Sequence, residues 1–285
     1  MSDIKIVCDS LSDLKKEMRE KYDVEMLPLT VIIDGKEYKD HVTITPSEFY
    51  EILDKKDVYP KTSQVTYGQF YECFKKYVDE GKTVLYISAS SYATGTYQSA
   101  LMAKEDVGGD IHVVDSRSLT YGISMLVLRA CELREQGKTV EEIVSELEEL
   151  RKRCFAIFYA DTLEYLKKGG RISSTKAVIG SVLNIKPLLC VNEQGTVSQL
   201  GQVRGKKHLA NKIVEVVRNT CSNDFKGEKV YIGYTSNLED AKIFGKIVEE
   251  DLNAKTEYIE IGPCIGTHGG PGVAGVICFK DKDRI

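Results

Sequence analysis

Short apolar runs, rich in β-branched residues, alternate with longer amphipathic stretches in the first half of the chain. The runs at Ile4–Asp9, Thr83–Ser88 and Ile111–Asp115 have the length and composition of buried β-strands. The amphipathic stretches have helical spacing, and two of them begin with a capping-box pattern, at Thr45 and Thr139. This alternation of strands and helices predicts a largely parallel sheet with helices on both faces.

The pattern of apolar runs starts again after Cys154, and here two runs are separated only by turn residues. Residues 186–204 read as a β-hairpin, so the second half is expected to carry a mixed sheet. We place the boundary between two α/β domains, residues 1–153 and 154–285. No linker rich in Pro, Gly or Ser separates them, so they are expected to pack tightly. The apolar runs of the second half are 155–160, 186–191, 229–234, 257–262 and 275–279.

Composition narrows the classes of function. The net charge of the 285 residues is -4, which disfavours nucleic-acid binding. The apolar runs are too short to span a membrane and the N-terminus lacks the pattern of a signal peptide, so we expect a cytoplasmic protein. The eight cysteines are scattered and form no Cys-x-x-Cys motif, which is typical of buried thiols in a reducing compartment and not of a metal site.

Polar residues gather where the predicted parallel strands end, the edge at which such sheets bind ligands. The sequence ASSYATGTYQ, residues 89–98, follows the run Thr83–Ser88 and is rich in hydroxyl and amide side chains, without any acid, base or histidine. Asp9 and Asp115 end the two neighbouring runs. Each of these positions also has a structural interpretation, because Ser, Thr and Asp cap helices.

Three further segments complete a candidate anion site. Thr62 and Ser63 precede a helical pattern. Arg171 follows a glycine pair at a predicted helix end, and His268 lies in GPCIGTHGGPGVAG, which we interpret as a glycine-rich loop. With Thr94, these side chains would form an anion site that lacks a carboxylate pair, a Gly-x-Ser-x-Gly motif and a phosphate-binding glycine motif. A lone histidine in a loop also has a purely structural interpretation.

The chain resembles the DegV family over nearly its whole length. The motifs that carry the resemblance occur in the family's order and approximate spacing: CDSLSDL, KTSQ, SSYATGTYQSA, VVDSRSLTYG, LEYLKKGGRIS, LNIKPLL and IGTHGGPG. The family includes the fatty-acid-binding subunit of bacterial fatty acid kinase. The resemblance therefore implies a two-domain fold that is distantly shared with dihydroxyacetone kinase subunits.

The resemblance also implies a ligand and its binding residues. Such proteins hold one long-chain fatty acid, for example palmitate or oleate, in a tunnel between the domains. The positions that contact the carboxylate in the family correspond here to Thr62, Thr94 and His268. Thr94 stands where serine is usual and keeps the hydroxyl group.

A separate partner is implied as well. In the family an ATP-dependent kinase subunit phosphorylates the bound acid to an acyl phosphate, so the binding protein has no catalysis, cofactor or metal of its own. The resemblance places Arg171 beside the head group, and we assign it, with Ser63 and Thr267, to the head group or to kinase docking. Transient contact with a membrane surface would allow ligand exchange.

Two other classes of function stay open at this point. The first is a stand-alone kinase-like or acyl-transfer enzyme that uses His268 as a base or nucleophile. No acidic cluster for Mg²⁺ beside a phosphate-binding loop supports that hypothesis. The second is a regulator that senses lipid. Thr120 and Tyr121 stand where small or apolar residues are usual in the family, so the resemblance does not fix the acyl chain.

Overall fold

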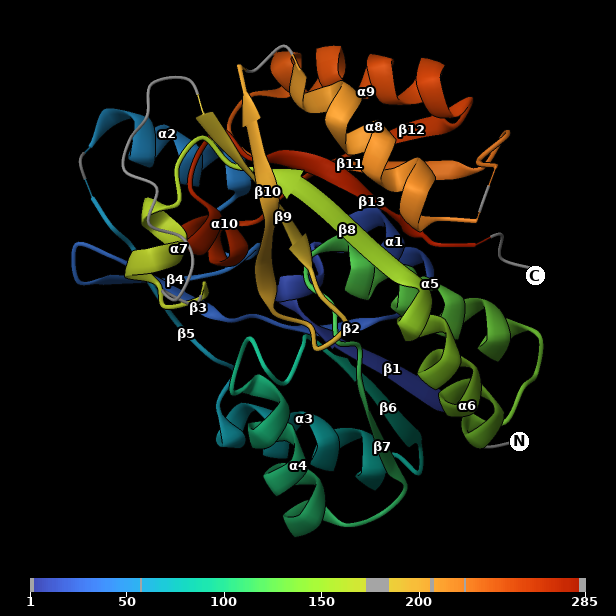
Figure 1. The fold of residues 1–285 in the computed structure, drawn as a ribbon. Helices are drawn as coiled ribbons and strands as arrows, with labels where there is room; N and C mark the ends of the chain where they lie inside the picture. Colours follow the sequence, from blue (N-terminus) through green and yellow to red (C-terminus); the bar gives the residue numbers. More distant parts are fainter. Residues whose placement is uncertain (1–2, 57, 173–184, 206–207, 223, 282–285) are drawn as a thin grey trace.

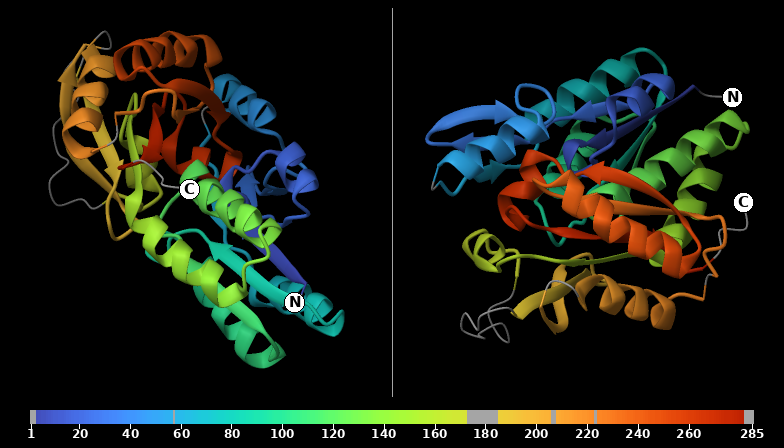
Figure 2. Two further views of the ribbon diagram at one scale, coloured as in Figure 1. Left: turned by 90° about the vertical axis from the view of Figure 1, so that its right-hand side faces the viewer. Right: turned by 90° about the horizontal axis from the view of Figure 1, so that it is seen from above.

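Two large β-sheets, one parallel and one mixed, form the framework of the molecule (Figure 1, Figure 2). The structure, a computed structural model, describes residues 3–56, 58–172, 185–205, 208–222 and 224–281. The parallel sheet uses strands from the first half of the chain and the mixed sheet uses strands from the second half. The predicted fold class is therefore confirmed, whereas the domain boundary at 153/154 stays a prediction.

The parallel sheet has the strand order β2-β1-β6-β7. Apolar and β-branched side chains fill its centre, and every residue of β1 and β6 is buried. Helices α3 and α4 lie on one side of this sheet and α5 and α6 on the other (Figure 1). The bounds are β1 (Ile4–Asp9), β2 (Glu25–Leu27), β6 (Thr83–Ser88), β7 (Ile111–Asp115), α3 (Tyr67–Asp79), α4 (Thr96–Val107), α5 (Tyr121–Glu135) and α6 (Val140–Leu150).

The mixed sheet has the strand order β10-β9-β8-β13-β11-β12, in which only β11 and β12 pair in parallel. Helices α8 and α9 cover its outer face (Figure 1). On the other face, Ala156 and Ile277 pack against Tyr121 and Met125 of α5, which joins the two sheets. The bounds are β8 (Cys154–Tyr159), β9 (Ile185–Val191), β10 (Val197–Arg204), β11 (Lys229–Tyr234), β12 (Lys255–Glu260), β13 (Ala274–Phe279), α8 (Leu209–Thr220) and α9 (Leu238–Leu252).

A small antiparallel sheet of order β4-β3-β5 is an element that the sequence pattern did not predict. Its strands are short, and Lys36–Lys39 alternates polar residues with a single tyrosine, so the usual hydrophobic signal is weak. The sheet matters for the site because β5 carries Thr62, which pairs with Val31 of β3. The bounds are β3 (Thr30–Ile33), β4 (Lys36–Lys39), β5 (Lys61–Ser63) and the adjacent helix α2 (Pro46–Lys55).

The two predicted capping boxes are present. Thr45 caps α2 and Thr139 caps α6, and in each case the hydroxyl accepts from the backbone N–H three residues later while the glutamate there accepts from the cap. Local sequence therefore fixes where these helices start. The remaining short elements are η1 (Ser10–Ser12), α1 (Lys16–Lys21), η2 (Arg151–Arg153) and α7 (Glu164–Lys168).

The interpretation of residues 262–275 as a loop is wrong for its first part, because Pro263–Gly269 forms helix α10. Pro263 suits the first helical position, where its missing N–H costs nothing. The glycines that follow are poor helix formers, but carboxylates from the first half of the chain accept hydrogen bonds at the start of the helix. His268 consequently lies in the last turn of a short helix and not in a loop.

Candidate functional site

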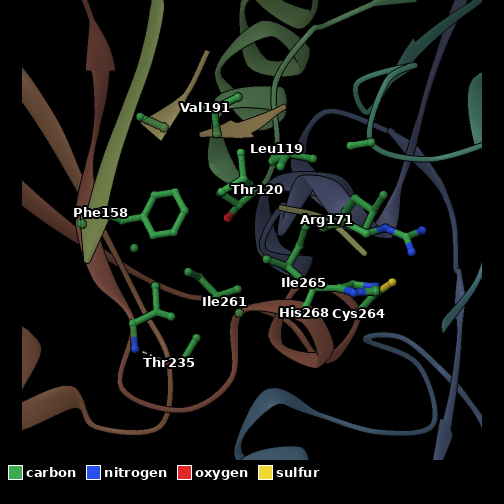
Figure 3. A pocket seen from close by; sticks show the side chains of 18 of the residues that line it. Leu119, Thr120, Phe158, Arg171, Val191, Thr235, Ile261, Cys264, Ile265 and His268 are labelled. Carbon is green, nitrogen blue, oxygen red and sulfur yellow. Dashed lines mark hydrogen bonds between the residues drawn. The ribbon is translucent and has the colours of Figure 1, made fainter. Parts of the chain in front are cut away.

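An apolar pocket lies between the two sheets (Figure 3). Its wall combines residues of the first half of the chain, such as Leu119, with residues of the mixed sheet, such as Phe158 and Val191. Arg171 and His268 lie on one side of the pocket and Phe158 lies on the opposite side (Figure 3). The pocket therefore has a polar end and an apolar end.

Thr62 and His268 meet at the polar end. Thr62 Oγ1 on β5 lies 3.0 Å from Nε2 of His268 on α10, and both residues line the pocket. His268 Nδ1 is buried and has no hydrogen-bond partner in the described part of the chain. It faces Gly169, where a Cβ atom would lie only 2.2 Å from Nδ1, so glycine at that position makes room for the ring.

His268 is uncharged near neutral pH. Burial lowers the pKa of its imidazole to about 4, and the neighbouring Arg171 adds to that effect. A buried N–H without an acceptor is rarer than a buried acceptor without a donor. The favoured tautomer therefore carries its proton on Nε2 and donates to Thr62, which leaves the Thr62 hydroxyl proton free for a ligand.

Arg171 brings a cation to the same end of the pocket. Its side chain is exposed, and Nη1 donates to the carbonyl oxygen of Gly169 at 2.6 Å. This hydrogen bond fixes the guanidinium beside the pocket, of which Arg171 is a lining residue. Among the described residues no further hydrogen bond of the guanidinium is found, so its other N–H groups suit an anion.

Thr94 also lines the pocket, but its hydroxyl has partners of its own. Oγ1 lies 2.9 Å from Oγ1 of Thr96 and accepts from the Thr96 backbone N–H at 3.3 Å, at the start of α4. The Gln64 side chain crosses Gly95, where a Cβ atom would lie 2.1 Å from Oε1. That close approach places the Thr62–Gln64 segment beside the Thr94 loop. Gly95 is the N-cap of α4 and no side-chain cap hydrogen bond is present there, so the Thr94–Thr96 contact belongs to the loop, and the ligand-binding role of Thr94 stays a prediction.

Two other hydroxyls of ASSYATGTYQ, those of Ser90 and Ser91, hold the loop itself. Ser91 Oγ donates to Asp115 Oδ2 at 2.7 Å, and Ser90 Oγ accepts from the Tyr92 N–H at 3.3 Å. The structural interpretation of Asp115 is supported in the same way, because its Oδ1 also accepts from the Arg117 N–H. Within this loop, Ala93 and Thr94 are the residues that reach the pocket wall.

Ser63 and Thr267 lie outside the pocket lining as described. Ser63 is exposed on β5, where strand alternation turns it away from the face that Thr62 presents. Thr267 is buried and donates to the carbonyl oxygen of Pro263 within α10. The structure thus brings Thr62, Thr94, Arg171 and His268 together. Head-group or docking roles for all of these residues stay predictions.

Asp13 is a residue of the site region that sequence reasoning missed. Its buried Oδ1 accepts from the Gly262 N–H at 2.9 Å and lies 3.0 Å from His41 Nε2, and Oδ2 accepts from Thr120 Oγ1 at 2.5 Å. Burial lowers the pKa of His41, but the hydrogen bond and charge of Asp13 and the charge of Asp40 outweigh it and raise the pKa. Asp13 lies 249 residues from Gly262, so no local motif could indicate the contact.

Asp40 holds the same end of α10. Its Oδ1 accepts from the Cys264 N–H at 3.3 Å and its Oδ2 accepts from Ser10 Oγ at 2.7 Å. We call Asp13, His41 and Asp40 the carboxylate clasp. Anionic groups at a helix N-terminus complement its free N–H groups. The clasp therefore positions the helix whose last turn carries His268.

The free energy of unfolding is expected to depend on pH because of Asp40 in the clasp. Burial raises the pKa of Asp40 from 3.8 to about 6, the charge of His41 lowers it and that of Asp13 raises it. The folded state thus binds the Asp40 proton more tightly than the unfolded state. Protonation of Asp40 therefore stabilises the fold fully below pH 3.8, and this stabilisation is lost as the pH rises through about 6. In Asp40→Asn, which mimics the neutral acid, the free energy of unfolding relative to the parent should rise by about 1–3 kcal/mol between mildly acidic and neutral pH.

Urea unfolding of both proteins across that pH range checks this prediction. The difference between variant and parent removes the titrating groups that do not interact with Asp40 and leaves Asp40 with its neighbours His41 and Asp13. A difference that is constant with pH would contradict the raised pKa.

Metal-binding clusters and membrane spans are both absent from the described residues. Within them, no group of three or more His, Cys, Asp or Glu side chains is arranged to hold a metal ion. None of the helices in the described ranges has the length and hydrophobicity of a membrane span. Seven of the eight cysteines are buried, and Cys154 is partly buried.

Comparison with known proteins places the chain in a family. The family model described as "Uncharacterised protein, DegV family" matches residues 3–281, and the chain belongs to the DegV family. A DegV domain-containing protein of Caldanaerobacter subterraneus subsp. tengcongensis is 39% identical over 99% of this chain and 100% of its own length. A relative from Clostridium perfringens is 36% identical over 97% of each chain.

Solved structures of the family have the same fold. A DegV family protein from Thermus thermophilus, described by its fatty acid binding, superposes with a TM-score of 0.89 at 33% identity and covers 98% of this chain and 100% of its own. A stearic acid-binding protein from Eubacterium ventriosum gives a TM-score of 0.89 at 30% identity, with 97% and 98% coverage. DegV from Bacillus subtilis, described as a fatty acid-binding protein, gives 0.86 at 30% identity, with 98% and 100% coverage.

Proposed function

We propose that this protein binds one long-chain fatty acid, with its tail between the sheets and its carboxylate at the end formed by His268, Thr62 and Arg171. The observation that carries the proposal is an apolar pocket with one polar end, to which both halves of the chain contribute. The descriptions of its structural relatives as fatty acid- or stearic acid-binding proteins support the same ligand.

The physics of transfer favours a long acyl tail. A palmitate tail carries about fourteen methylenes, each worth about 0.8 kcal/mol on burial. The gross gain of about 11 kcal/mol exceeds the lower estimates of the association cost, about 4–15 kcal/mol. The tail therefore supplies most of the affinity, and a short acid would bind poorly.

The head group needs hydrogen-bond donors, because a buried carboxylate without them is unfavourable. The Thr62 hydroxyl, oriented by His268, and the Arg171 guanidinium supply a neutral and a charged donor. Thr94 supplies a further hydroxyl on the same wall. Predominantly neutral donors hold the acid without a tight buried ion pair, which keeps one carboxylate oxygen available for chemistry.

Extraction tests the proposal directly. Protein purified from bacterial cells is extracted with organic solvent, and the extract is analysed by mass spectrometry for fatty acids. The delipidated protein is then titrated with palmitate and oleate. A protein that emerges empty and takes up neither acid would refute fatty-acid binding.

We further propose that the protein has no catalysis of its own and presents the bound carboxylate to a separate ATP-dependent kinase in the cytoplasm. The exposed Arg171 at the polar end would lie where the phosphoryl group arrives or where the partner docks. The rival hypothesis of an enzyme based on His268 is less well supported, because Nε2 already engages Thr62 and Nδ1 faces Gly169.

Arg171→Ala is expected to keep most of the fatty-acid affinity but to slow acyl-phosphate formation by the kinase about tenfold. The tail dominates binding, whereas a guanidinium suits developing phosphoryl charge or an acidic docking surface. Parallel measurements of oleate affinity and of phosphorylation with kinase and ATP check this. Lys167→Ala, an exposed cation of the same segment that does not line the pocket, is the matched control. Equal phosphorylation by the Arg171 variant and the parent would contradict the prediction.

A further inference from the structure

Two glycines lie side by side in the wall of the pocket. Gly233 of β11 pairs directly with Gly275 of β13, and Gly275 pairs with Phe158 of β8. All three residues line the pocket, so this cross-strand row faces it. Phe158 Cβ crowds the position that a Gly275 Cβ atom would take, so the trough in this row is the space over Gly233, which Gly275 separates from Phe158. Phe158 lies across the pocket from Arg171 and His268, so the trough belongs to the apolar end (Figure 3).

The fold requires only one of these glycines. A Cβ atom at Gly275 would lie 2.4 Å from the carbonyl oxygen of Ile157 and 2.4 Å from Cβ of Phe158. The backbone fixes the positions of both atoms, so neither could move away. A Cβ atom at Gly233 would meet its nearest neighbours, side-chain atoms of Ile277 and Ile261, at 3.4 Å and 3.5 Å, which is ordinary van der Waals contact.

Backbone conformation does not require glycine at Gly233 either, since it is absent from the residues with positive φ. Glycine in the interior of a strand weakens the strand, and it often marks a position where a ligand approaches the backbone closely. Packing and conformation therefore leave the open pocket as the physical reason for a glycine here.

We propose that Gly233 is the residue that sets the length and bulk of the acyl tail that the pocket accepts. The far end of the tail lies over its Cα atom, in the trough that the missing side chain leaves. This inference rests on the proposed fatty-acid binding and deepens it, because it names the determinant of acyl-chain specificity.

Binding of a chain-length series to delipidated protein tests the inference. The probes are laurate, myristate, palmitate, stearate and arachidate, titrated into the parent, Gly233→Ala and Gly233→Val. We expect the affinity for the longest acids that the parent binds to fall about tenfold in the alanine variant, the size typical of overpacking by one methyl group, and further in the valine variant. The shortest acids should keep their parental affinity, so the preferred length shifts downward.

The melting temperature of each variant distinguishes a change in acyl-chain specificity from damage to the fold. The melting temperature of ligand-free Gly233→Ala should equal or exceed that of the parent, because alanine suits a strand better than glycine. Gly201→Ala is the matched control: Gly201 lies in β10, outside the pocket lining, and a Cβ atom there would meet nothing within 4 Å. It should leave the chain-length profile unchanged.

The outcomes are distinguishable. If the parent binds these acids and both Gly233 variants share its profile, this inference is overturned and the proposed function stands. If the parent binds none of them, the proposed function fails and the inference fails with it. Equal changes in Gly201→Ala and Gly233→Ala would also overturn it.

Discussion

His268→Ala is expected to bind palmitate about ten- to a hundredfold more weakly than the parent at neutral pH. In the favoured tautomer the imidazole donates from Nε2 to the Thr62 hydroxyl, 3.0 Å away, so its removal leaves that hydroxyl without the partner that would orient it toward the carboxylate. Because burial and Arg171 keep the pKa of His268 at about 4, the loss is that of a neutral hydrogen-bonded pair and not of a cation. Titration calorimetry on delipidated protein measures it.

A double-mutant cycle makes this prediction specific. His268→Ala and Thr62→Val act on one hydrogen-bonded unit, so the loss in the double variant should be smaller than the sum of the two single losses. His112→Ala, a partly exposed histidine on β7 paired with Asp110, is the matched control and should bind palmitate as the parent does. Additive losses at His268 and Thr62 would show that the two side chains act independently.

Asp13→Ala is expected to lower the free energy of unfolding by about 3–5 kcal/mol, the range for breaking a buried ion pair. The Asp13 side chain is fully buried and serves His41, the Gly262 N–H and Thr120 at once. Removing it leaves the cationic form of His41 with less compensating charge and the start of α10 with an unpaired N–H group. Urea unfolding at neutral pH measures the loss.

Part of that loss would come from the backbone, and a matched variant accounts for it. Asp13 has a φ of 52°, a left-handed conformation that aspartate tolerates better than alanine. Asp34 has a φ of 50° but is exposed, so Asp34→Ala carries the conformational cost without the buried partners. Its expected loss is about 1 kcal/mol. Similar losses at the two positions would contradict a stabilising role for the clasp.

The sequence predicts those parts of the fold in which local pattern and tertiary packing agree. The strands Ile4–Asp9 and Thr83–Ser88 are buried along their whole length, so an unbroken apolar run is both their sequence signal and their packing requirement. The capping boxes at Thr45 and Thr139 are local in the same sense. Strand β5 has three residues and no such pattern. It is a strand because it pairs with β3, and a local sequence pattern cannot predict that pairing.

The candidate site, like the fold, could be predicted only in part from the sequence. Motif resemblance brought Thr62, Thr94, Arg171 and His268 into one hypothesis, and the structure places all four around one pocket. Helix α10, which contains His268, was not predicted because its glycines are poor helix formers. The carboxylates that stabilise it come from 224 and 249 residues earlier in the chain. Contacts of that kind have no local signature, so they could not be predicted from spacing or propensity.

A fatty acid bound as proposed would bridge the two sheets, because both halves of the chain contribute to the wall of the pocket. A molecule that contacts Leu119 on one side and Phe158 on the other adds its own binding energy to their cohesion, so the loaded protein should resist heat and proteases better than the empty one. Release of such a ligand would require the contacts between the two sheets to loosen around the pocket. Resistance to heat and to proteases would therefore report whether the pocket is occupied.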